Sequence, residues 1–180
     1  YIDVPLQHTH DHLLKLMKRQ ESEKGVRGML DELRHKIPGV ALRTTFITGF
    51  PGEKDEHFRH MADFLKEMEF DHVGVFTYSN EEGTTAYAYP DRVPKKVAEA
   101  RRKELMLIQK EIAQRKNTGK IGQTHPVLVE GVDDEESYLV TGRLATQAPE
   151  IDGQVILEEC EFTSGQIVPM RITGATDYDL

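Results

Sequence analysis

Short apolar runs alternate with helical patterns over the first two-thirds of the chain. The runs at 1–6, 41–48 and 72–78 are rich in β-branched and other apolar residues, which favours strands. Each run is followed by a segment in which apolar residues recur every three or four positions, as at Phe58, Met61 and Leu65. This alternation predicts βα units that share a parallel sheet.

Local signals predict where the helices begin and end. Thr9 is expected to cap a helix that buries Leu13 and Leu14, and a second helix is expected to start near Ser22. The Pro-Gly pair at 38–39 should stop that second helix. A third helix follows the glycine-containing turn at 49–52, and a fourth, strongly amphipathic, covers 95–116.

After residue 117 the pattern changes. Short β-rich runs at 126–130, 138–144, 154–158 and 167–172 are separated by Gly, Asp and Pro turns, without a helical period. Such spacing predicts a small antiparallel barrel or sandwich. The sequence therefore predicts two domains, one at 1–117 around a parallel sheet and one at 118–180 that is all β.

The net charge of −8 is unevenly distributed between these domains. Residues 1–117 hold 20 Lys and Arg against 19 Asp and Glu, whereas residues 118–180 hold 3 against 12, a balance of −9. An acidic surface repels polyanions and attracts basic polypeptides, although a charge run can also be a solvated face. The residues expected to receive a basic partner are Asp133, Asp134, Glu135, Glu136, Glu158, Glu159 and Glu161.

The single cysteine, Cys160, excludes an internal disulfide and a cysteine-based metal site formed by this chain alone. A reducing, cytoplasmic setting is the expectation. No apolar run approaches the ~20 residues that cross a bilayer. Because the chain opens at Tyr1 rather than at Met, we interpret it as a fragment.

Polar and glycine-rich clusters follow each predicted strand, at 7–9, 48–53 and 79–84. In parallel βα assemblies the carboxyl ends of the strands form the functional rim, so these clusters are the candidate site. Gly49 and Gly52 let the backbone approach a ligand closely, or merely make a tight turn. His8 and His12 would share one helix face, a spacing that can hold a metal, but we expect no metal site and place His8 on the rim.

Three ordered blocks resemble the radical-SAM methylthiotransferases. They are 1–8 (Tyr-Ile-Asp-Val-Pro-Leu-Gln-His), 42–53 (Leu-Arg-Thr-Thr-Phe-Ile-Thr-Gly-Phe-Pro-Gly-Glu) and 76–84 (Phe-Thr-Tyr-Ser-Asn-Glu-Glu-Gly-Thr). Residues 118–180 resemble the TRAM domain that closes these proteins. The resemblance implies an α/β fold, in which the C-terminal half of an open radical-SAM (βα) barrel is followed by a small antiparallel β-barrel TRAM domain.

The resemblance also implies contacts to S-adenosylmethionine (SAM) at the strand ends. Arg43 and Thr45 share strand parity, so both can point inward, although an ion pair within the protein is an equally good role for Arg43. The expected contacts are Gln7 at the ribose, a wall of Arg43, Thr45, Ile47 and Gly49, and a border to the adenine from Phe76 to Tyr78.

Enzymes of this family hold two 4Fe–4S clusters on cysteine thiolates. They form a deoxyadenosyl radical from SAM, abstract a substrate hydrogen and insert a methylthio group. The resemblance implies that those cysteines lie upstream of Tyr1, and Cys160 cannot replace them. The chain alone is therefore expected to be inactive, and no catalytic residue is assigned within it.

The family divides between transfer RNA substrates and an aspartate on protein twelve of the small ribosomal subunit. Because nucleic-acid binding depends on Lys and Arg, the acidity of 118–180 favours the ribosomal protein. The segments at 148–153 and 172–180 also resemble the RimO type, which acts on that protein. The alternatives are a tRNA-modifying enzyme whose TRAM domain binds RNA, and a non-catalytic interaction module.

Overall fold

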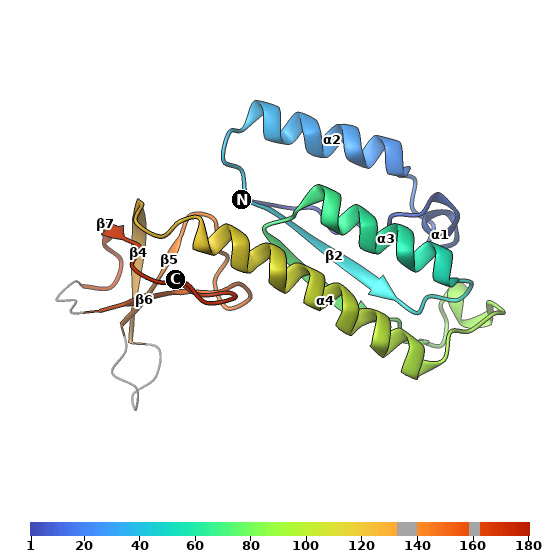
Figure 1. The fold of residues 1–180 in the computed structure, drawn as a ribbon. Coiled ribbons are helices and arrows are strands. Elements are labelled where there is room, and N and C mark those ends of the chain that lie inside the picture. Colours follow the sequence, from blue (N-terminus) through green and yellow to red (C-terminus); the bar gives the residue numbers. More distant parts are fainter. Residues whose placement is uncertain (133–139, 159–162) are drawn as a thin grey trace. The chain divides into compact units, whose positions relative to one another are not determined.

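The computed structural model describes residues 1–132, 140–158 and 163–180 of the chain. They divide into two compact units, Ile2–Gln109 and Lys110–Leu180, the second of which also includes Tyr1. The division lies within the last helix, upstream of the boundary at 117 that the sequence pattern predicts. In chain order (Figure 1) the elements are β1 (Ile2–Asp3), α1 (Asp11–Leu16), α2 (Glu23–Lys36), β2 (Leu42–Thr48), α3 (Asp55–Met68), β3 (His72–Thr77), the 3-10 helix η1 (Thr85–Ala88), α4 (Lys95–Thr118), β4 (Thr124–Val132), β5 (Val140–Leu144), β6 (Val155–Leu157) and β7 (Ile167–Arg171).

The first unit is built on a parallel sheet in the order β1-β2-β3. The first strand is shorter than the expected 1–6, because Pro5 has no N–H to give to the ladder. The segment rejoins β2 at Gln7, whose N–H donates to the Thr45 carbonyl and whose carbonyl accepts from the Ile47 N–H, both at 2.8 Å. The chain therefore follows β2 to its carboxyl end, as the βα pattern predicts.

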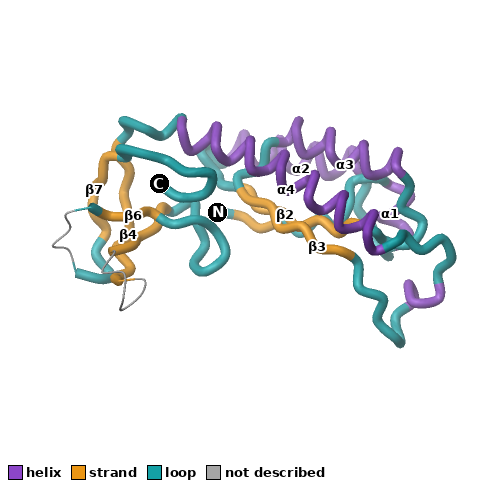
Figure 2. Tube along the Cα trace, turned by 60° about the horizontal axis from the view of Figure 1, so that its bottom comes forward, coloured by secondary structure: helices purple, strands orange, loops and turns teal. Residues whose placement is uncertain are grey.

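The two faces of this sheet differ. Along β2, buried residues alternate with half-exposed ones, so that Leu42, Thr44, Phe46 and Thr48 are buried. The helices α2 and α3 and the first part of α4 lie over one face (Figure 2). Phe46 packs there against Phe70, with ring centroids 6.3 Å apart. The opposite face, which carries the odd-numbered residues of β2, is left open for the site described below.

The helix starts follow local capping chemistry. Ser22 caps α2 as expected, because its side chain accepts from the Gly25 N–H. Thr9 does not cap α1: its hydroxyl bonds to Nδ1 of His60 at 2.9 Å, and His10 takes the capping position instead. The expectation for Thr9 was therefore wrong, because a contact with α3 engages its side chain.

The second unit holds a four-stranded antiparallel sheet in the order β6-β5-β4-β7. Its core is a cluster of small aliphatic side chains that alternate along the strands: Val127, Val129, Leu144, Val155 and Leu157. The C-terminal residue is tied to β6, since the Leu180 carbonyl accepts from the Ile156 N–H at 2.8 Å. In the residues that the structure describes, no helix is long and apolar enough to cross a membrane.

Candidate functional site at the carboxyl ends of the strands

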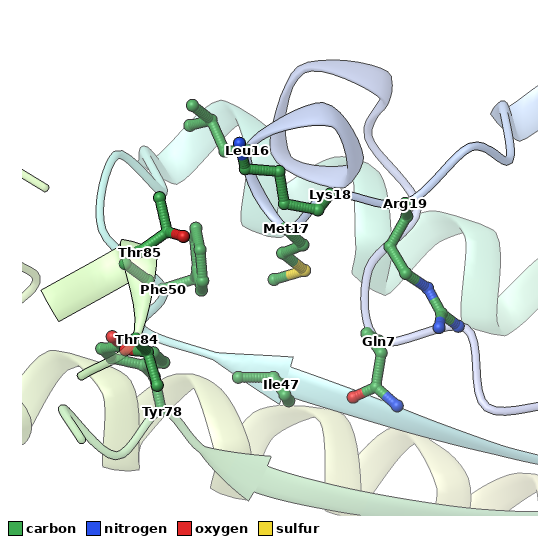
Figure 3. A pocket seen from close by; sticks show the side chains of 11 residues that line it. Gln7, Leu16, Met17, Lys18, Arg19, Ile47, Phe50, Tyr78, Thr84 and Thr85 are labelled. Atoms are coloured by element: carbon green, nitrogen blue, oxygen red, sulfur yellow. The ribbon is translucent and has the colours of Figure 1, made fainter. Parts of the chain in front are cut away.

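A cavity of about 400 Å³ lies at the carboxyl ends of β1, β2 and β3 (Figure 3). Its base is formed by Ile47 of β2, with Gln7 beside it and Tyr78 beyond the end of β3. Clefts of this size hold small organic ligands, which are gripped by apolar walls and a few polar groups. The remaining lining residues are Leu16, Met17, Lys18, Arg19, Phe50, Thr84, Thr85 and Ala86.

The cavity combines apolar walls with a polar rim. Phe50 and Tyr78 meet edge to face, with ring centroids 5.1 Å apart. Met17 and Lys18 follow directly after α1, and Figure 3 shows Lys18 along one edge of the cavity, with its side chain running toward Leu16. Arg19 lies near Gln7 in the same view. The lining therefore combines the apolar surface of Phe50, Tyr78 and Ile47 with the Gln7 amide and the cations of Lys18 and Arg19.

The structure brings together some of the residues expected to contact SAM and separates others. Gln7, Ile47 and Tyr78 all line the cavity. Gly49 lies at the neighbouring turn and lines a second cavity of about 340 Å³, to which Tyr78 also contributes. Other residues that line this second cavity include Ser79, Asn80, Arg92 and Lys95.

Arg43, Thr45 and Phe76 lie on the same open face of the sheet, around Gly74. A Cβ atom built at Gly74 would lie 3.4 Å from a ring carbon of Phe76, 3.5 Å from Nη2 of Arg43 and 3.7 Å from Oγ1 of Thr45. Phe76 is 59% exposed, whereas Nη1 of Arg43 donates to Asp3 at 2.7 Å. The sequence left two roles open for Arg43, an ion pair within the protein and a contact to a ligand. The structure shows the ion pair with Asp3. The sequence reasoning did not single out Gly74.

Gly49 shows why the turn after β2 needs glycine. Its φ is +81°, a left-handed conformation, and a Cβ atom there would lie 2.4 Å from the Cβ of Ala98 on α4. The turn is therefore fixed both by its backbone conformation and by its contact with the helix. The structure thus shows the tight turn, and the close approach of a ligand to this backbone stays a prediction.

His8 is not on the exposed rim. It is 1% exposed, and its Nδ1 accepts from the N–H groups of Thr9 (2.9 Å) and His10 (3.0 Å). Because Nδ1 is an acceptor, the ring proton lies on Nε2, which faces Oε2 of the buried Glu53 at 3.6 Å. The sequence could not reveal this, because Glu53 is distant along the chain.

His8 and His12 do not share a helix face either, because α1 begins only at Asp11. His10 instead stacks near His57 of α3, with ring centroids 4.3 Å apart. Burial lowers the pKa of His10, and the nearby His60 lowers it further. Burial likewise lowers the pKa of His57, with a further contribution from His10. These rings favour the neutral state at the α1–α3 contact.

The residues present do not fit an iron–sulfur cluster. Such a cluster is held by several thiolates, and the chain has one cysteine, Cys160, which lies outside the described residues. No group of three His, Cys, Asp or Glu within the described ranges could hold a metal ion.

In the second unit, carboxylates of the described residues serve mainly in internal contacts. Glu130 pairs with Arg143 at 2.6 Å, and Asp177 pairs with Lys110 at 2.8 Å. Glu158 is exposed. The other residues expected to receive a basic partner lie outside the described residues: Asp133, Asp134, Glu135, Glu136, Glu159 and Glu161.

Comparison with solved structures supports the fold. The described architecture is similar to coproporphyrinogen III oxidase (HemN) of Escherichia coli, which is described as a radical SAM enzyme. The TM-score is 0.53 at 13% identity, over 79% of this chain and 38% of that one. At this identity the likeness shows the fold alone, and it confirms the expected radical-SAM type of α/β architecture.

Comparison of sequences covers the whole chain. The relatives include the ribosomal protein uS12 methylthiotransferases RimO of Syntrophotalea carbinolica (46% identical) and Microcystis aeruginosa (48%), each over 100% of this chain. The chain spans only about 40% of the length of these relatives. Residues 121–180 match the TRAM domain family model. The resemblance stated from the sequence is thus confirmed: throughout its length the chain matches part of the RimO methylthiotransferases, with a TRAM domain at its end.

Proposed function

We propose that the chain is part of an enzyme that attaches a methylthio group to an aspartate of ribosomal protein uS12, in the cytoplasm. The observation that carries this proposal is the whole-length similarity to proteins named for that activity, at 46% and 48% identity in the two relatives above. The complete enzyme would use SAM and two 4Fe–4S clusters. Because this chain does not fit a cluster, its own contributions are SAM binding and substrate docking.

The strand-end cavity is the proposed site for the adenosyl part of SAM. Ile47 and the ring of Tyr78 supply apolar surface for the adenine, and the Gln7 amide can donate to and accept from the ribose hydroxyls. Lys18 and Arg19 line the same cavity and suit the carboxylate of the amino-acid end. Gly49 shapes the turn, while Arg43, Thr45 and Phe76 extend the wall along the open sheet face.

A titration of the 180-residue chain with SAM tests this assignment. Replacing Ile47 with aspartate puts a charge on the apolar base, so we expect the Kd to rise about tenfold or more. Ile156→Asp on the exposed position of β6 is the control, and it should leave the Kd unchanged. Equal affinities of SAM for the wild type and Ile47→Asp would contradict the assignment.

The acidic second unit is the proposed docking surface for the basic ribosomal protein. With 3 Lys and Arg against 12 Asp and Glu, residues 118–180 have few of the cations that bind phosphates. Binding to a basic ribosomal protein should therefore weaken as salt increases. A chain that retained tRNA at moderate salt but not the ribosomal protein would contradict this proposal.

A further inference from the structure

Glu53 is a fully buried carboxylate that lies against the turn after β2, the segment after β1 and the helix α4. Its side chain is 0% exposed, as is that of His8, and that of Arg101 is 10% exposed. We propose that Glu53 is a positioning residue for the cavity: it holds the turn after β2 and the segment after β1 where an adenosyl ligand needs them. The ligand part of this inference rests on the proposed function.

The first contact fixes the turn that carries Phe50. Oε1 of Glu53 accepts from the Gly49 N–H at 3.1 Å, within a buried environment. Gly49 has no side chain, so no side-chain packing of its own can hold its left-handed conformation. The carboxylate therefore adds to the helix contact that fixes the turn carrying Phe50, and removing it leaves the buried Gly49 N–H without its acceptor.

The second contact faces the segment that carries Gln7. Gln7 has a φ of +68°, a left-handed conformation that is unfavourable for a residue with a side chain. Its neighbour His8 is oriented by two backbone N–H groups at Nδ1, so that its Nε2–H points at Oε2 of Glu53. Neither of these two atoms has a hydrogen-bond partner within the described residues. The negative charge of Glu53 therefore faces the Nε2–H of His8 and favours this position of the segment that carries Gln7.

Arg101 anchors the carboxylate from α4. Its Nη1 donates to Oε1 of Glu53 at 2.6 Å and to the Glu53 carbonyl at 3.2 Å. A second Glu–Arg pair, Glu104 with Arg59 at 2.5 Å, also involves α4 but is exposed and touches neither of the two segments. Glu104→Gln is therefore a matched control for Glu53→Gln, because each substitution changes a Glu–Arg pair that involves α4.

Glu53→Gln should disturb both segments for a specific reason. If the new amide oxygen keeps the contacts to Gly49 and Arg101, its NH₂ faces the Nε2–H of His8, donor against donor. Relief requires His8 to change tautomer and lose the two backbone bonds at Nδ1. We expect faster hydrogen exchange at the amides of Ile47 and Gly49 and at His10, and a Kd for SAM raised about tenfold.

Two controls separate positioning from general stability. Glu104→Gln should leave both the exchange rates and the Kd unchanged. Leu105→Ala removes a fully buried core side chain on α4, so it should lower the melting temperature without changing the Kd of the folded chain. If Leu105→Ala raises the Kd as much as Glu53→Gln does, the role of Glu53 is only structural and the inference is overturned.

His8 substitutions keep the test decisive if Glu53→Gln does not fold. His8→Asn retains an oxygen near Nδ1 for the two N–H groups but removes the group that faces Glu53. His8→Gln does the reverse. We expect His8→Asn to weaken SAM binding. An unchanged Kd for SAM in the folded variant would overturn the positioning role of Glu53.

The two proposals fail in different ways. If the wild type does not bind SAM while Glu53→Gln or His8→Asn still speeds exchange at Gly49 and His10, the proposed ligand is wrong and the positioning of the segments stands. If exchange at these amides is unchanged, Glu53 does not position them, whatever the ligand is.

Discussion

The two units of the chain use charge in opposite ways. In the first unit a carboxylate is buried at Glu53, between Arg101 and His8, and each of its oxygens faces a defined group. In the second unit, Glu130 and Arg143 form a partly exposed pair, and residues 118–180 hold 3 Lys and Arg against 12 Asp and Glu. Single buried charges fix geometry, whereas many exposed charges act together through a long-range field that salt screens.

The largest expected contrast is between the two ion pairs. Arg101→Gln leaves the Glu53 carboxylate buried with its charge uncompensated, so the free energy of unfolding should fall by about 3–5 kcal/mol. Arg143→Gln removes a partly exposed pair and should change the free energy by less than about 1 kcal/mol. Denaturant melts of the two variants measure this difference. Similar losses for both would contradict the contrast between the units.

The turn after β2 should be nearly as sensitive. In Gly49→Ala the new methyl group would overlap Ala98 and strain a left-handed residue, so we expect a loss of about 3 kcal/mol. Gly39→Ala is the matched control, because Gly39 has a φ of +76° but no atom within 4 Å of a built Cβ. Thermal melts should show a loss of about 1 kcal/mol there, from backbone strain alone. A smaller loss at Gly49 than at Gly39 would contradict the proposed packing.

Acid should weaken the contact between α1 and α3. The folded-state pKa values of His10 and His57 are lowered by burial and by neighbouring histidines, so the unfolded chain binds more protons once the pH falls below the ordinary histidine value of about 6.5. Stability from these groups is therefore complete above that value and is lost as the pH falls through and below it. The titratable groups that face these rings include His60, Glu56 and Glu23. Burial raises the pKa of Glu23, but hydrogen bonds from Arg27 and His60 outweigh burial, so that the pKa of Glu23 is lowered overall.

The check is a melting-temperature profile between pH 5 and pH 7.5 for the wild type and His57→Gln. The variant should show a shallower decline towards low pH. Exposed His35→Gln on α2 is the control and should follow the wild type. A wild-type profile that is flat across this range would show that these rings do not titrate as described.

The smallest effect is expected from neutralising two acidic residues in the second unit. Asp133→Asn combined with Glu135→Gln should raise the Kd for a basic ribosomal protein about two- to threefold at low salt, and the difference should vanish at high salt. Asp31→Asn with Glu32→Gln makes the same charge change on α2 and should leave the Kd unaltered. An equal effect of both pairs would mean that net charge alone, rather than the second unit, attracts the partner.

Sequence patterns predicted much of this architecture, because it depends on local rules. Alternation along 41–48 and helical spacing after Asp55 are visible in one dimension, and strand parity correctly placed Arg43 and Thr45 on one face. Ser22 was recognised as a cap because its chemistry is local. By contrast, the burial of His8 against Glu53 brings together residues that meet only after folding, so the sequence could not predict it. Gly74 was missed for the same reason. Its lack of a side chain matters only because the side chains of Phe76, Arg43 and Thr45 lie over it in the folded sheet.

We propose that the strand-end cavity is a ligand site shaped by fixed geometry, separate in role from the acidic unit. An amide chemical-shift titration of the whole chain with SAM tests it most directly. We expect shifts at Gln7, Ile47, Phe50 and Tyr78 and none across β4 to β7. Shifts concentrated in residues 121–180, with the amides of the cavity unmoved at saturating SAM, would contradict it.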